Sequence, residues 1–265
     1  MRIERGDGEP LMDGAPAGFT LLPGSDPVSP GQTTRVFAVA RGGETYVCKR
    51  LGSRALSEPW MRQRLAAEGR LLAELAGCAS PRLVASGEDA HGPWIVMERV
   101  AVPPLASRFG APQGPWVERA TSAAFDALST IHAAGVIHGD VSPDNVLLSE
   151  DAARAVLIDF GLALAPSMPP LPAGPFRGTL LYAAPELARG EPVDGRADLF
   201  AMAASLLHVA SGEPPRAQAT DAAMLLAAGG DGIDAWAARA ARGLAPAVAR
   251  ILVTRCSFDA KDRVA

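Results

Sequence analysis

Short apolar and β-branched runs, separated by glycine-rich or charged turns, dominate the first hundred residues. Two such runs, Thr34–Val39 and Thr45–Lys49, predict strands, and the Arg-Gly-Gly-Glu sequence at 41–44 predicts a hairpin turn between them. Apolar positions at helical spacing predict a helix over Ser57–Leu75, with its first residue as the expected N-cap. Pro93–Glu98 is predicted to be a further strand.

After Pro104 the pattern changes to mostly helical. Two short apolar runs, Val146–Leu148 and Ala155–Ile158, flank a polar turn and predict a small hairpin. The Pro-rich stretch at 161–178 is not expected to form regular structure. Four segments carry helical patterns, namely Trp116–Ala134, Asp198–Ala210, Asp221–Ala228 and Ile233–Cys256.

The order of these elements predicts an α+β fold of two lobes. A small antiparallel β lobe with one helix is followed by a larger, mainly helical lobe. We expect a loose leader at residues 1–18, the first lobe at 19–100 and the second at 101–265. A chain of 265 residues is long enough to bury a core of this size.

The composition is that of a folded protein, with 48% hydrophobic and 20% charged residues. The net charge is −4 and no basic run stands out, so we expect no nucleic-acid partner. No apolar run reaches the roughly 18 residues of a membrane helix, and the N-terminus lacks the apolar centre of a signal peptide. With only 3 cysteines the chain has no disulfide framework, and we expect a cytoplasmic location without a membrane segment.

Two residue types are rare enough to draw attention to their positions. Among 25 basic residues only Lys49 and Lys261 are lysines, and Asn145 is the sole asparagine. Lysine and asparagine codons are AT-rich, so this bias is typical of a GC-rich, bacterial coding sequence. A lysine or asparagine that persists in such a sequence is more often kept for its own chemistry.

Polar residues that can bind a metal or transfer a proton cluster around the small predicted hairpin. Asp140 and Asn145 precede its first strand, and Asp159 follows its second strand. Carboxylate and amide oxygens of this kind suit Mg²⁺, which binds few carboxylates together with phosphate and water oxygens. A carboxylate that touches no metal can orient or deprotonate a hydroxyl nucleophile.

These motifs resemble the protein kinase superfamily over roughly Phe19 to Arg263. Val47-Cys48-Lys49 resembles the strand with the phosphate-binding lysine, and Glu68 on the predicted helix resembles its glutamate partner. The joint match in order and spacing makes the resemblance specific. The other matching motifs are His138-Gly139-Asp140 with Asn145, Asp159-Phe160-Gly161, Gly178 to Glu186, Asp198, and Arg263 as the partner of Glu186.

The resemblance implies a two-lobed kinase-like fold that transfers phosphate with ATP and Mg²⁺ as cofactors. The first lobe would bind the nucleotide, and the second would bind substrate. The family usually has one more helix after the position of Arg263, and the sequence does not decide whether this chain is trimmed or the lobe ends early. The catalytic set would be Lys49 on the phosphates, Glu68 fixing Lys49, Asp140 taking the hydroxyl proton, and Asn145 and Asp159 as Mg²⁺ ligands. The nucleotide would lie among Gly31, Val36, Val47, Lys49, Met97, Glu98, Val100 and Leu147.

The resemblance also implies supporting roles. His138 would pack beneath Phe160 and bond to backbone, and Asp198 would tether the backbone of the catalytic loop.

The glycine-rich loop departs from the family pattern. Of three expected glycines only Gly31 is present, and Ser29 and Thr34 occupy the other two positions. Hydroxyls and backbone N–H groups can still face phosphate there. This departure, together with Ser142 in the catalytic loop, motivates a second hypothesis, a pseudokinase that binds a nucleotide or a partner without turnover.

The catalytic loop and the activation segment depart from the pattern as well. Gly139 replaces an arginine that commonly receives a phosphate, and Ser167 is the only hydroxyl residue between Leu162 and Arg177. We therefore expect that phosphorylation of this segment does not switch the protein. Ser142 stands where protein kinases usually have a lysine. With Gly139, it motivates a third hypothesis, a small-molecule phosphotransferase similar to aminoglycoside kinases.

The leading hypothesis is a bacterial Ser/Thr protein kinase. The Gly178 to Glu186 segment resembles the peptide-docking part of protein kinases, and Thr179 fits a preference for serine and threonine acceptors. The expected partner is a protein substrate, and a regulatory partner is compatible with the sequence. The sequence specifies neither the physiological substrate nor the oligomeric state.

Overall fold

The computed structural model describes residues 14–23, 33–110, 114–174, 176–216, 220–228, 230 and 232–263. The chain forms two compact units, one of Met1–Ala66 with Val84–Arg99 and one of Ala67–Leu83 with Val100–Ala265. The first unit contains the five-stranded sheet, and the second contains most of the helices and a two-stranded hairpin, so the predicted α+β class is confirmed. The predicted bounds of the leader and the two lobes stay predictions.

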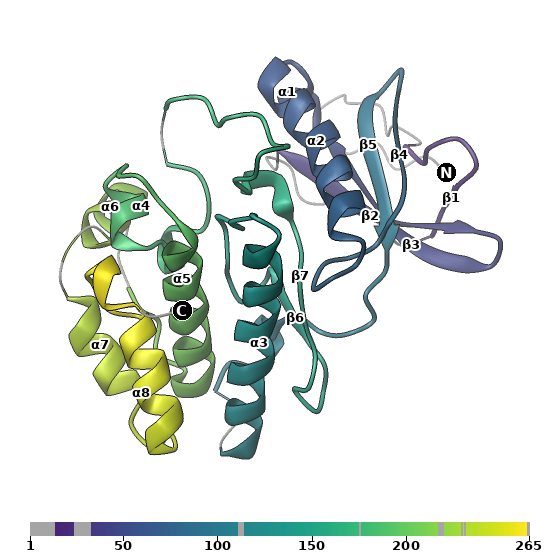
Figure 1. The fold of residues 1–265 in the computed structure, drawn as a ribbon. Coiled ribbons are helices and arrows are strands. Elements are labelled where there is room, and N and C mark those ends of the chain that lie inside the picture. The colour runs from purple at the N-terminus through teal and green to yellow at the C-terminus, as the bar shows by residue number, and fades with distance from the viewer. Residues whose placement is uncertain are drawn as a thin grey trace. The chain divides into compact units, whose positions relative to one another are not determined.

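The first unit is built on a five-stranded sheet with the order β1-β2-β3-β5-β4 (Figure 1). Its hairpin turn lies at the predicted position, where Gly42 and Gly43 have φ values of 61° and 84°. Such a left-handed pair favours glycine. The strands are β1 (Thr20–Leu21), β2 (Thr34–Arg41), β3 (Glu44–Leu51), β4 (Leu83–Asp89) and β5 (Gly92–Glu98).

The pairing register divides the side chains of this sheet between two faces. Val36 lies opposite Lys49, and Val47 lies opposite Met97. Opposite residues share a face, and so do residues two apart on one strand. These four side chains therefore lie on one face. The other face carries a closed hydrophobic cluster of Phe37, Val39, Cys48 and Val96.

The beginning of the described chain covers that hydrophobic cluster. Phe19 and Leu21 pack against it. The buried Arg50 donates from Nε to the carbonyl oxygen of Gly14 at 2.6 Å. Its two terminal nitrogens donate to the two carboxylate oxygens of Asp89 at 2.9 and 2.6 Å. This bidentate pair fixes the approach of residue 14 to the sheet.

Two helices follow β3. Helix α1 (Ser53–Leu56) has Ser57 as its C-cap, and helix α2 (Pro59–Leu75) begins two residues after that cap. The prediction of Ser57 as an N-cap was wrong, because its backbone is helical and its N–H bonds to the carbonyls that close α1. Proline at the first helical position suits the start of α2. One face of α2 is buried and carries Leu65, Leu72 and Leu75 together with the carboxylate of Glu68.

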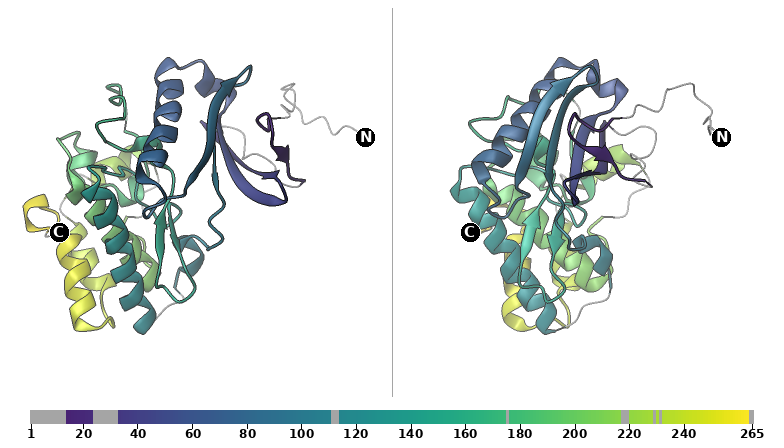
Figure 2. Two further views of the ribbon diagram at one scale, coloured as in Figure 1. Left: turned by 45° about the vertical axis from the view of Figure 1, so that its right-hand side comes forward. Right: turned by 90° about the vertical axis from the view of Figure 1, so that its right-hand side faces the viewer.

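The core of the second unit is built around two neighbouring helices, α3 (Pro115–Ala133) and α5 (Gly195–Ser211) (Figure 1). Helix α5 starts at the N-cap Asp194 and is buried along nearly its whole length, so it is a core helix of this unit. The hairpin of β6 (Val146–Leu148) and β7 (Ala155–Leu157) lies beside α3 (Figure 2). Among the helices of the described segments, none combines the length and hydrophobicity that a membrane span requires.

The pattern over 233–256 forms two helices instead of one. They are α7 (Ile233–Ala240) and α8 (Pro246–Arg255), and the break contains Gly243 with φ 86°. Pro246 cannot continue a helix from the preceding turn, but it suits the first position of a new one. The remaining elements are η1 (Leu105–Arg108), η2 (Phe160–Leu162), η3 (Leu180–Tyr182), α4 (Pro185–Ala188), α6 (Asp221–Ala228) and η4 (Ala260–Asp262).

Candidate active site

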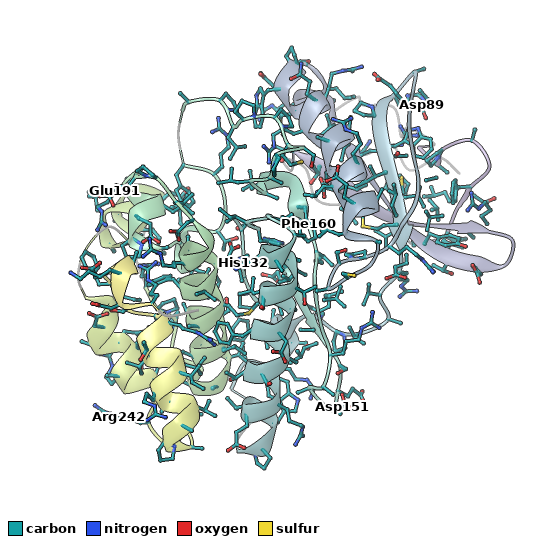
Figure 3. All side chains as sticks on the ribbon, in the orientation of Figure 1. Asp89, His132, Asp151, Phe160, Glu191 and Arg242 are labelled. Atoms are coloured by element: carbon teal, nitrogen blue, oxygen red, sulfur yellow. The ribbon has the colours of Figure 1, made fainter. Side chains whose placement is uncertain are left out.

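The loop between α3 and β6 is anchored to helix α5 by one buried carboxylate. Asp198, 1% exposed, accepts hydrogen bonds from the backbone N–H groups of His138 at 2.7 Å and Gly139 at 2.9 Å. Its Oδ2 also lies 2.8 Å from Nε2 of His132, which Figure 3 places on α3. Hydrogen bonds to a desolvated carboxylate are strong. The tether predicted for Asp198 is therefore present.

Asp140 is oriented by bonds to both of its carboxylate oxygens. Oδ1 accepts from the backbone N–H of Thr179 at 2.8 Å, and Oδ2 accepts from Nδ2 of Asn145 at 3.3 Å. Gly178 has a φ of 107°, and a Cβ there would lie 3.2 Å from Oδ1 of Asp140. The glycine thus permits the close approach of residues 178–179 to this carboxylate.

Gly139 has a conformational role in the same loop. Its φ is 78°, and a Cβ at this position would meet the carbonyl oxygen of Leu162 at 2.7 Å. The segment after η2 is also bound by a two-way backbone bridge between Ile137 and Leu164, with N–H to O distances of 2.9 and 2.8 Å. Backbone contacts therefore hold the start of the activation segment against the catalytic loop.

Asp159 occupies the N-cap of η2 in the left-handed region, with φ 65° and ψ 77°. Its Oδ1 accepts from the backbone N–H of Gly161 at 3.2 Å. Beside it, the rings of His138 and Phe160 lie 4.9 Å apart, and Nε2 of His138 is 3.0 Å from the carbonyl oxygen of Ile158. His138 is fully buried, which confirms its predicted structural role.

The donor set of Asn145 and Asp159 fits a magnesium ion. Nδ2 of Asn145 donates to the carbonyl oxygen of Asp140 at 2.9 Å, and no described residue donates to its amide oxygen. The Asn145 carbonyl accepts from Ile158 N–H at 2.9 Å, so both oxygen donors lie at one end of the β6–β7 hairpin. The described residues hold no group of three or more His, Cys, Asp or Glu suited to a metal. Magnesium here would therefore also require phosphate and water oxygens.

A recess lies beside Asp140 in the second unit. The catalytic loop forms one wall, and the end of the activation segment with the first turns of α4 and α5 forms the rest. Its lining is mainly apolar. The residues that line it are Gly139, Asp140, Val141, Phe176, Thr179, Tyr182, Ala183, Ala184, Leu187, Ala197, Asp198 and Ala201.

The residues predicted to hold the nucleotide divide between the two units. Lys49, on β3, is 3% exposed and shares its sheet face with the predicted base contacts of the first unit. Glu68, in the second unit, is 2% exposed. Gly31 and Ser29 lie outside the described residues. In the first unit the others are Val36, Val47, Met97 and Glu98, and in the second they are Val100 and Leu147.

The end of the activation segment is fixed by a buried ion pair. Arg263 donates to the two carboxylate oxygens of Glu186 at 2.5 and 2.9 Å. It also donates to the carbonyl oxygen of Ser257 at 2.8 Å. The pairing predicted between residues 186 and 263 is therefore present. A bidentate pair with satisfied nitrogens is the geometry in which a buried ion pair is tolerated.

Sequence reasoning missed three side chains that support the site. His132 reaches Asp198. The Tyr182 hydroxyl lies 2.8 Å from Nδ1 of His208, and burial lowers the pKa of His208 and raises that of Tyr182. Arg216 contacts backbone carbonyls of η3. Each partner is distant in sequence, so no local motif indicates these contacts.

Ser167 is held by a hydrogen bond without phosphorylation. Its hydroxyl donates to Oε2 of Glu74, near the end of α2, at 2.9 Å. The bond is exposed, and such bonds contribute about 1 kcal/mol or less. We expect Ser167→Ala to change turnover by less than about tenfold, or ~1.4 kcal/mol. Steady-state transfer rates of the two proteins test this, and a larger fall would show that Ser167 acts as a switch.

Comparison with known proteins identifies the family to which this arrangement belongs. The family model described as "Protein kinase domain" matches residues 27–237, which is most of the chain. The chain belongs to the protein kinase family. Membership in this family is consistent with three features that occur together here: the Asp198 tether, the oriented Asp140, and the buried pair of Glu186 and Arg263.

Individual bacterial relatives match parts of this kinase domain. The serine/threonine-protein kinase PknI of Mycobacterium tuberculosis is 39% identical over 131 residues, covering 46% of this chain and 20% of the relative. The DNA damage-responsive serine/threonine-protein kinase RqkA of Deinococcus radiodurans is 37% identical over 174 residues, covering 62% of this chain and 26% of the relative. The serine/threonine-protein kinase Pkn1 of Myxococcus xanthus is 38% identical over 129 residues, covering 46% and 19%. The matched part is thus about a quarter or less of each relative.

Proposed function

We propose that this kinase domain transfers the γ-phosphate of Mg-ATP to serine or threonine hydroxyls of a protein. The observation that carries the proposal is the orientation of Asp140. Its carboxylate is held by Thr179 from the activation segment and by Asn145 from the catalytic loop, and it lies at the edge of a recess. A carboxylate held at both oxygens is preorganised to orient an acceptor hydroxyl and to take its proton.

The other polar residues are assigned to positioning and charge. Asn145 and Asp159 would hold magnesium, and Lys49 would hold the α- and β-phosphates with Glu68 as its positioning partner. Bound Mg-ATP supplies the phosphoryl group and neutralises the charge that develops during transfer. Asn145 has a second function, because its amide nitrogen orients Asp140 while its oxygen is left for the metal. Val36, Val47 and Met97 provide an apolar sheet face suited to the adenine ring.

The recess beside Asp140 favours a polypeptide acceptor over a polar small molecule. Of its side chains only Asp140 and Asp198 are acidic, and Asp198 is already occupied by three donors. Phe176, Tyr182 and Leu187 contribute apolar surface instead. Such a surface suits an apolar side chain next to the acceptor hydroxyl, whereas a polycationic small molecule needs several free carboxylates.

Labelled ATP tests the proposed activity directly. The protein is incubated with γ-labelled ATP, Mg²⁺ and three peptide libraries with a central serine, threonine or tyrosine. We expect label in the first two libraries. Asp140→Asn removes the base and, with its single amide oxygen toward the Thr179 N–H, keeps one of the two hydrogen bonds. We expect it to lower the rate by about 10²–10⁴-fold.

The same assay separates the alternatives. Label that enters only small acceptors, such as amino sugars, would replace the proposal with a small-molecule kinase. Nucleotide binding by calorimetry with equal, background-level transfer in the wild type and Asp140→Asn would indicate a pseudokinase.

A further inference from the structure

Arg216 lies beneath the segment that holds the catalytic carboxylate. It follows helix α5, and its Nη1 donates to the carbonyl oxygen of Leu181 at 2.9 Å, with the Leu180 carbonyl oxygen at 3.4 Å. Both carbonyls belong to η3, which starts directly after Thr179, the donor to Asp140. One side chain thus connects the core of the second unit to the backbone beside the recess.

The burial of Arg216 carries a free-energy cost, and no carboxylate in the described part of the chain pairs with its guanidinium to offset it. The residue is 7% exposed, and its Nε and Nη2 have no hydrogen-bond partner among the described residues. Burial lowers its pKa to about 10, so the guanidinium still carries its charge at neutral pH. The nearby Cys256 offers no negative charge, because burial raises the pKa of its thiol to about 12. An apolar side chain would avoid this desolvation cost.

A neighbouring arginine shows what a structural arginine looks like in the same core. Arg263 and Arg216 both lie over the ring of Phe200, with guanidinium carbons 4.8 and 5.6 Å from its centroid. Arg263 has a bidentate carboxylate partner, Glu186. The shorter of the two printed hydrogen bonds of Arg216 goes instead to a backbone carbonyl of η3, that of Leu181. A costly buried group directed at the site is typical of a functional role.

We propose that Arg216 is a positioning residue that holds η3, and through it Thr179, in the geometry needed for acceptor binding. The assignment to acceptor binding rests on the proposed function, whereas the effect on η3 does not. Tyr182, at the end of η3, is held by His208 of α5. Two side chains therefore hold η3: Arg216 binds its backbone at the Leu181 carbonyl, and His208 binds the Tyr182 side chain.

The test compares Arg216→Met, Arg216→Lys and Arg255→Met in the full chain. Arg255 is the matched control, since it also lies over a phenylalanine ring, that of Phe125 at 3.9 Å, and burial also lowers its pKa. It lies on α8, outside η3. The readouts are amide hydrogen exchange of η3, melting temperature, and KM for acceptor and for ATP.

Arg216→Met is expected to speed exchange of the Tyr182 and Ala183 amides by about tenfold, because a charged donor to η3 is lost. The KM for a peptide acceptor should rise by a similar factor while the KM for ATP stays within about twofold. The melting temperature should change by about 3 °C or less, since the lost bond is offset by relief of the buried charge. Arg216→Lys should restore part of both effects, and Arg255→Met should show neither.

Several outcomes would overturn this role. Unchanged exchange in η3, an equal rise in both KM values, or a large fall in melting temperature would each make Arg216 an ordinary structural residue. A variant too unstable to purify counts as the last of these. If the wild type transfers no phosphate, the proposed function fails, and the exchange measurement alone decides whether Arg216 holds η3.

Discussion

Asp159→Ala is expected to lower magnesium-dependent phosphoryl transfer by about 10³-fold or more. The change removes the single carboxylate from the proposed metal donor set and leaves the Asn145 amide oxygen alone. A hard divalent cation binds weakly to one neutral oxygen. The measurement is the initial rate of transfer over a magnesium titration, in which the variant should not recover at high metal concentration.

A second variant separates the metal from the backbone. Asp159 has a φ of 65°, a conformation that alanine adopts poorly and asparagine tolerates. Asp159→Asn keeps the backbone and loses the charge, so it should be nearly as inactive as Asp159→Ala. Asp126→Ala, at an exposed position of α3, is the control that should retain wild-type transfer. An active Asp159→Asn variant would refute the assignment of residue 159 as a metal ligand.

Asp198→Asn is expected to destabilise the second unit by about 3–5 kcal/mol. The carboxylate accepts from two backbone N–H groups and contacts His132, so an amide NH2 would face a donor in a site that is 1% exposed. The melting temperature should fall by about 10 °C, as measured by calorimetry. Transfer should fall as well, because the loop that carries Asp140 loses its anchor.

The same helix offers the control for this substitution. Asp194 caps α5 and pairs with Arg196, and its side chain is 54% exposed. Asp194→Asn keeps a good N-cap residue and should cost well under about 1 kcal/mol. Similar melting temperatures for the two variants would contradict the role of Asp198 as the anchor of the catalytic loop.

An element was predicted correctly where residues next to each other in the sequence mark its position, and it was missed where they do not. The β2–β3 hairpin was predicted correctly because two glycines mark its turn. Strand β4 was missed because its last four residues are exposed and polar or glycine, so the sequence shows no apolar alternation. Helices α7 and α8 merged in the prediction because their apolar positions continue the same period across the break near Gly243.

The residues of the site divide in the same way between those that the sequence indicates and those that it does not. Asp140, Asn145 and Asp159 could be found from sequence because they flank one hairpin, and the chemistry of their oxygens restricts what they can bind. The contacts of His132, His208 and Arg216 could not be found, because each is set by tertiary packing. A buried arginine after a core helix gives no sequence signal of which backbone it faces.

The conformation of Gly139 bears on how this kinase domain could change during evolution. A side chain at this position must adopt a left-handed backbone, and its Cβ would lie 2.7 Å from the Leu162 carbonyl oxygen. An arginine that receives a regulatory phosphate therefore cannot be gained here by one codon change alone, since the chain after η2 must also shift. A phosphate-receiving arginine at this position would therefore require a coupled rearrangement of two parts of the backbone, the catalytic loop and the segment that follows η2.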